Sequence, residues 1–175
     1  AGYNLIDTHK AARFGLLASV NSFVGGIPID FGTTNYTANT SGEFSVEAWV
    51  NGGAQTTDAG IITKGTGSGG EQFNLDCGGG GHAFRFFVRD YKDPVNGGGN
   101  AHLATSSVTP NSQWHHLVGV CDQSNGIVVL YVDGVSNASG TISTTAGILN
   151  STNPVTFGSR QSGSTSFDNQ FIGLM

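Results

Sequence analysis

The sequence predicts an all-β domain, and three observations support this. There are 28 glycines but only 11% charged residues, a composition typical of short strands joined by tight turns. Eleven phenylalanines and both tryptophans supply apolar area for a core, which argues against a disordered chain. Residues 114–122 and 126–134 alternate apolar and polar side chains around a turn rich in residues that tolerate left-handed backbone, the pattern of a β-hairpin, and Asp133-Gly134 is expected to close the second strand with another tight turn. At 175 residues we expect one two-layer domain.

The strand expected over residues 44–50 places successive side chains on opposite faces. Its apolar face and that of the hairpin should form the core, with these members: Phe44, Val46, Ala48, Val50, Val118, Val120, Leu130 and Val132. Trp49 then lies on the face opposite the core, with Ser45 and Glu47.

Further strands are expected at residues 60–65, 72–77, 82–89, 101–106 and 154–158. The four glycines at 78–81 form a flexible turn, and since they lead into a strand rather than a helix we expect no phosphate site there. Residues 1–26 stand apart as an N-terminal arm or extension. Within it, residues 8–20 have helical spacing, although Gly15 interrupts it. The arm is expected to be an irregular first strand packed on the domain; the alternative is an extension that contacts a neighbouring molecule.

Four segments resemble, in order, strands of the laminin-G-like domains of the concanavalin A-like lectin/glucanase superfamily. They are residues 44–50, 60–65, 114–134 and 154–158. The resemblance extends over residues 27–175 and implies an antiparallel two-sheet jelly-roll sandwich of the concanavalin A-like type. It also implies that the family's usual last strand is missing after Met175. An edge without that strand must be filled by a neighbouring subunit, by the 1–26 arm or by further residues of the same polypeptide.

The net charge, the absence of long apolar runs and the two cysteines bear on which partners and which covalent bonds to expect. The net charge is −5 and the few basic residues are scattered, so we expect neither nucleic acid nor anionic lipid as a partner. No apolar run is long enough for membrane insertion. Cys77 and Cys121 end two expected strands, and we expect a disulfide between them, the alternative being two buried free thiols.

Catalysis is not expected. Retaining glucanases need two carboxylates about 5 to 5.5 Å apart on one strand face. No strand here carries the Glu-x-Asp-x-x-Glu array that such members of the superfamily show. His115 and His116 are consecutive in a strand and point to opposite faces, so they cannot share one metal ion.

Binding is the expected activity. Sugar recognition needs exposed aromatic faces beside hydrogen-bonding groups, and the candidates are Tyr36, Trp49, Tyr91 and Tyr131. The alternative, which the sequence favours for both tryptophans, is packing in the core or at its rim. The resemblance makes calcium a candidate cofactor, and its candidate ligands are Asp30, Asn35 and Asp168.

The sequence therefore predicts a non-catalytic recognition or adhesion module that binds glycan or a protein surface and works outside the cell or on its surface. The alternative is a structural subunit of a homo-oligomer or virion, such as a phage capsid decoration or fibre protein, or of a surface filament.

Overall fold

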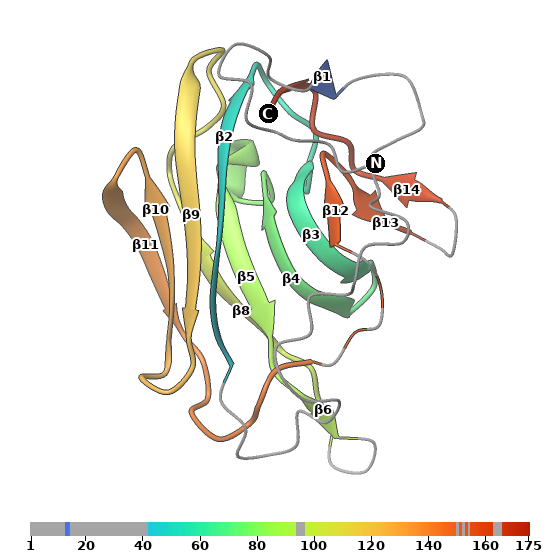
Figure 1. Ribbon diagram of the computed structural model, residues 1–175, viewed down its shortest axis with the longest axis vertical. Helices are drawn as coiled ribbons and strands as arrows, with labels where there is room; N and C mark the ends of the chain where they lie inside the picture. Colours follow the sequence, from blue (N-terminus) through green and yellow to red (C-terminus); the bar gives the residue numbers. More distant parts are fainter. Residues whose placement is uncertain are drawn as a thin grey trace, which may run out of the picture.

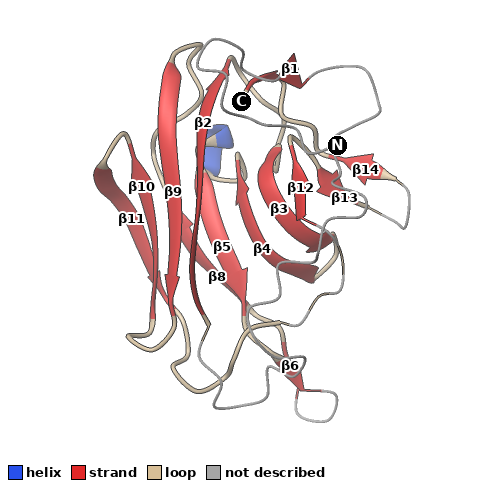
Figure 2. Cartoon of the chain, in the orientation of Figure 1, coloured by secondary structure: helices blue, strands red, loops and turns tan. Residues whose placement is uncertain are grey.

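The computed structural model describes residues 13–14, 42–93, 97–149, 151, 153, 155–162 and 166–175. They form two β-sheets packed face to face (Figure 1), with one short 3-10 turn, Gly80–His82, among them (Figure 2). This confirms the predicted all-β sandwich. No helical segment in this part of the chain is long and apolar enough to span a membrane.

Sheet A contains the predicted hairpin and is antiparallel throughout. Its strands, in spatial order, are β1 (Arg13–Phe14), β15 (Gly173–Leu174), β2 (Glu43–Gly52), β9 (Trp114–Asp122), β10 (Ile127–Val132) and β11 (Val135–Thr141). The β10–β11 turn has positive φ at Asp133 (53°) and Gly134 (80°), as the two-residue turns favoured in hairpins require. The Asp-Gly signal in the sequence therefore predicted this turn correctly.

Sheet B supplies the second layer. Its strands, in spatial order, are β14 (Phe167–Asp168), β13 (Arg160–Gln161), β3 (Gly60–Thr66), β4 (Gly70–Asp76), β5 (Arg85–Arg89) and β8 (Ala101–Thr105), and β12 (Val155–Phe157) also pairs with β3. All pairings are antiparallel except the contact of β13 with β3. Two short strands, β6 (Lys92–Asp93) and β7 (Gly97–Gly98), form a separate ribbon.

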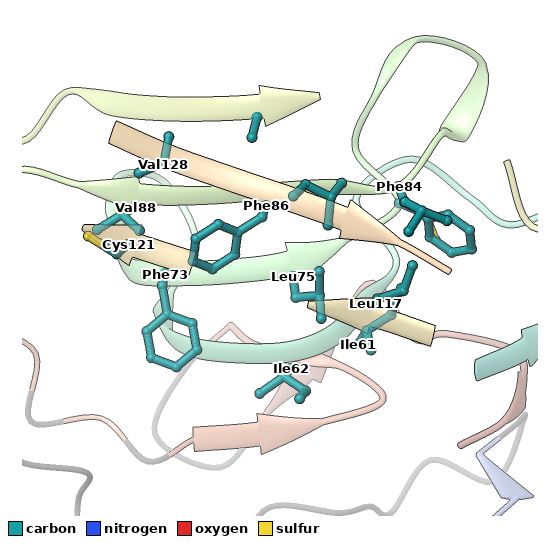
Figure 3. Packing of buried hydrophobic residues seen from close by; sticks show 14 of the residues in the cluster. Ile61, Ile62, Phe73, Leu75, Phe84, Phe86, Val88, Leu117, Cys121 and Val128 are labelled. Atoms are coloured by element: carbon teal, nitrogen blue, oxygen red, sulfur yellow. The ribbon is translucent and has the colours of Figure 1, made fainter. Parts of the chain in front are cut away.

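The core lies between the sheets (Figure 3), and the predicted members from β2 and β10 belong to it or pack against it. The prediction for β9 is wrong. Leu117, Gly119 and Cys121 face the core, whereas Val118 and Val120 are half-buried on the outer face. The strand register gives the reason, since Val118 pairs with Glu47 and Val120 with Ser45, both of which point outward. A Cβ at position 119 would collide with the Phe86 ring of the opposite sheet. This position of β9 therefore requires glycine.

The disulfide prediction is also wrong, because Cys77 and Cys121 are free and buried. Cys77 follows β4 in sheet B, whereas Cys121 lies in β9 of sheet A. Cys121 pairs with Phe44, whose ring contacts Phe73 in the middle of β4, at a centroid distance of 5.2 Å. The two thiols therefore belong to different sheets, and they lie next to different parts of β4. Burial raises the pKa of the Cys121 thiol to about 12 and also raises that of Cys77.

The edge of the sandwich formed by β8 and β11 is closed by side chains. His102 Nδ1 lies 2.7 Å from the Thr141 carbonyl oxygen, and Nε2 lies 3.2 Å from Asp90 Oδ2. Ser106 Oγ donates to Asn137 Oδ1 at 2.6 Å. These contacts tie the last strand of one sheet to that of the other.

At the other edge of sheet A, two residues of the N-terminal arm pair with the end of the chain. Arg13 is opposite Leu174 and Phe14 opposite Gly173, and β15 in turn pairs with β2. Residues 13–14 therefore form a strand. The helical spacing of apolar residues over 8–20 does not produce a helix at these two positions. The remainder of the arm lies outside the described residues, so its predicted boundary at residue 26 stays a prediction.

Candidate functional site

A chain of ion pairs covers the outer face of sheet B. Arg85 stands at one end, where Nη2 lies 2.7 Å from both Asp58 Oδ1 and Asp76 Oδ2, and Nε donates to Asp76 Oδ1 at 3.0 Å. Burial raises the pKa of Asp76, although the hydrogen bonds and charge of Arg85 act in the opposite direction. The Asp76 side chain is fully buried, so Arg85 is its essential counter-ion.

The chain continues through Phe87 to Arg89, Glu71 and Arg160. The Phe87 ring lies beneath two guanidinium groups, with Arg85 Cζ at 5.0 Å and Arg89 Cζ at 5.6 Å from its centroid. Glu71 accepts from Arg89 Nε and from Arg160 Nη1, both at 3.2 Å. These contacts fill the outer face of sheet B with side chains that already bind one another.

Asp168, the one calcium candidate among the described residues, is engaged in this chain. Its two carboxylate oxygens accept from Arg160 Nε at 3.1 Å and Nη2 at 3.0 Å. The described ranges contain no group of three or more His, Cys, Asp or Glu side chains placed to hold a metal ion. Asp30 and Asn35 lie outside these ranges, so calcium binding by them stays a prediction.

The outer face of sheet A is different because it presents aromatic rings. Trp49 on β2 is 59% exposed and stacks on the His116 ring of β9, with centroids 4.9 Å apart and planes 24° apart. His116 Nε2 lies 3.3 Å from Glu47 Oε2. Trp114 shares the outward side of β9 with His116 and is 43% exposed. Both tryptophans therefore lie outside the core, which leaves rim packing as the alternative to ligand binding.

Tyr131 also belongs to this face. It pairs with Val118, which in turn pairs with Glu47, so Tyr131 stands two strands away from β2. We call these five residues the Trp49 surface: Glu47, Trp49, Trp114, His116 and Tyr131. The sequence identified Trp49 and Tyr131 but missed the others. The spacing of Trp114 and His116 placed them on one side of their strand, but nothing in the sequence showed that this side is the outer one.

His115 points away from the Trp49 surface, as predicted for consecutive strand residues, and is buried. Its Nδ1 lies 2.8 Å from Asp133 Oδ2 and its Nε2 lies 3.0 Å from Asn111 Oδ1, and its ring meets Phe84 edge-on. Burial acts to raise the pKa of Asp133, but the hydrogen bonds from His115 and from the His116 backbone N–H outweigh it and lower that pKa. His115 therefore has a structural role, tying β9 to the β10–β11 turn.

The other aromatic candidates do not join this surface. Tyr91 is half-buried and packs against the core. Tyr36 lies outside the described residues.

Comparison with known proteins identifies the family. A laminin G family model, described as the concanavalin A-like lectin/glucanases superfamily, matches residues 28–174. The chain belongs to this superfamily. No curated protein matches the sequence of this laminin G-like domain.

Solved structures resemble this laminin G-like domain at low sequence identity. The CBM40 domain of the Ruminococcus gnavus IT-sialidase bound to alpha2,3 sialyllactose is 14% identical, with a TM-score of 0.51, over 80% of this chain and 74% of that one. The same domain bound to alpha2,6 sialyllactose is 14% identical, with a TM-score of 0.50, over 79% and 74% of the two chains. Domains LG4-5 of the mouse laminin alpha1 chain are 15% identical, with a TM-score of 0.43, over 79% of this chain and 35% of that one. At these identities the two CBM40 structures support the fold alone.

Proposed function

We propose that this laminin G-like domain is a non-catalytic recognition module, exposed outside the cell or on its surface, that binds glycan through the Trp49 surface. The observation that carries the proposal is the geometry of Trp49. One face of its indole rests on His116 while the side chain remains 59% exposed. An indole held in this way offers a flat apolar face to a sugar ring, and Glu47 and His116 beside it can bond to hydroxyl groups.

The outer face of sheet B is the poorer candidate. Asp76 and Glu71 have side chains 0% and 4% exposed and are held by arginines. A ligand would have to break these ion pairs before it could contact either carboxylate, and losing a buried partner is strongly unfavourable. The same pairing opposes a glycosidase role, since a nucleophile and an acid must both be free to reach the substrate.

A glycan array tests the proposal. The wild-type protein should bind a subset of glycans, and Trp49→Ala should weaken that binding about tenfold or more, as for the loss of a central aromatic contact. Leu103→Ala is the matched control, because Leu103 is an apolar residue 42% exposed on β8 in the other sheet, and it should bind as the wild type does.

Three results would overturn the proposal: no glycan bound by the wild type, unchanged binding by Trp49→Ala, or equal losses in both variants. Repeating the array with a chelator tests the calcium prediction for Asp30 and Asn35. The assembly-subunit alternative predicts a solution mass several times 18.0 kDa, which size-exclusion chromatography with light scattering measures.

A further inference from the structure

We propose that His116 is the positioning residue of the Trp49 surface and that its protonation makes this surface a better binding platform. The ligand part of this inference rests on the proposed function, but the coupling of His116 to Trp49 does not. His116 is the only ring that Trp49 stacks on among the described residues, and its Nε2 faces Glu47 Oε2 at 3.3 Å. One imidazole therefore links the exposed indole to a carboxylate on the same strand, β2.

Two acidic groups lie beside His116. Glu47 approaches from β2, and Asp133 in the β10–β11 turn accepts the His116 backbone N–H through Oδ1 at 2.8 Å. The neighbouring His115 ring lies on the opposite face of β9 and bonds Asp133 Oδ2. Two carboxylates, those of Glu47 and Asp133, therefore lie near His116, whereas the His115 ring points to the opposite face of β9.

Protonation changes both contacts of the His116 ring. The bond to Glu47 becomes an ion pair, and the imidazolium lies against the indole face as a cation on an aromatic ring. The His116 side chain is 27% exposed and that of Glu47 72%, so water and salt screen both effects. Histidine changes charge between about pH 5 and 8. As the pH rises through this range, Trp49 loses part of its support and becomes less ordered.

A less ordered Trp49 binds more weakly, because the ring must be immobilised when the ligand arrives. The stabilisation of an exposed cation–aromatic contact corresponds to about a two- to fivefold change in an equilibrium constant. We therefore expect glycan binding two- to fivefold tighter at pH 5.5 than at pH 8.

The first experiment needs no ligand. In the Trp114→Phe protein, Trp49 is the only tryptophan. Its fluorescence reports the protonation of the His116 ring on which it stacks, because imidazolium quenches indole more strongly than imidazole does. The fluorescence should fall on acidification, with one transition between about pH 5 and 8. Adding His116→Gln should abolish that transition. Adding His82→Gln should preserve it, since His82 lies in the Gly80–His82 turn and bonds Thr57.

The second experiment repeats the glycan array at pH 5.5 and pH 8 with the wild type, Glu47→Gln and His116→Gln. Both variants should lose the pH dependence while retaining some binding. A flat fluorescence profile, or a transition that survives His116→Gln, would refute the role of His116 whatever the array shows. A fluorescence transition together with an array in which nothing binds would instead uphold the His116–Trp49 coupling and reject glycan as the ligand.

Discussion

Arg85 should be one of the most stabilising charged residues of the fold, because it is the counter-ion of a carboxylate that has no access to water. Its side chain is 15% exposed, that of Asp76 is 0% exposed, and three nitrogen–oxygen contacts of 2.7 to 3.0 Å join the guanidinium to Asp58 and Asp76. Removing one partner of a buried ion pair costs about 3–5 kcal/mol. Since Arg85 is partly solvated, we expect Arg85→Met to lower the free energy of unfolding by about 3 kcal/mol at pH 7. For a domain of this size that corresponds to a fall in Tm of roughly 6–12 °C.

The pH dependence gives this prediction a second readout. Without Arg85, the pKa of Asp76 in the folded protein should rise further, because the hydrogen bond and charge that oppose the effect of burial are gone. A carboxyl group whose pKa is raised on folding stabilises the folded state increasingly as the pH falls. The destabilisation of Arg85→Met should therefore shrink between pH 7 and pH 4.

Urea unfolding followed by circular dichroism measures both effects. Asp58→Asn is the matched control: it removes the other carboxylate of the same guanidinium, but that side chain is 34% exposed, so the loss should be below about 1 kcal/mol. Adding Asp76→Asn to Arg85→Met should restore most of the lost stability. The reasoning fails if Arg85→Met destabilises no more than Asp58→Asn does, or by the same amount at every pH.

Three further predictions concern the core. Leu117→Ala should lower the free energy of unfolding by about 2–5 kcal/mol, whereas Val118→Ala should lower it by less than about 1 kcal/mol. If urea titrations show a larger loss for Val118→Ala than for Leu117→Ala, then the other face of β9 is the buried one. Gly119→Ala should destabilise by about 1–3 kcal/mol because its methyl group meets the Phe86 ring, and Gly80→Ala, with open space around it, should melt close to the wild type in thermal scans. Both cysteine thiols should react with a thiol reagent at pH 8 only in denaturant, and a protein that yields no thiol when denatured without reductant would contain the disulfide after all.

Local pattern predicted most of the longer strands, although not β11. Alternation in residues 44–50 gave the strand β2 and the outward position of Trp49, because successive side chains of a strand always point to opposite faces. The Asp133-Gly134 pair predicted a tight hairpin turn, since both residues tolerate positive φ. The order of four such segments was sufficient to recognise the superfamily that the family model matches over residues 28–174.

What only the tertiary structure decided is which side of each strand faces the core and which distant side chains meet. On β9 both sides carry apolar residues, so alternation defined two faces without saying which is buried; pairing with β2 placed Leu117 inside and Val118 outside. The same register brought His116 beside Trp49, and the packing of the two sheets left Cys77 and Cys121 buried and unpaired. The ion pair of Arg160 with Glu71 joins residues 89 positions apart in the sequence. Such contacts depend on the packing of the whole sandwich, whereas the strands themselves are specified by the alternation of their own residues.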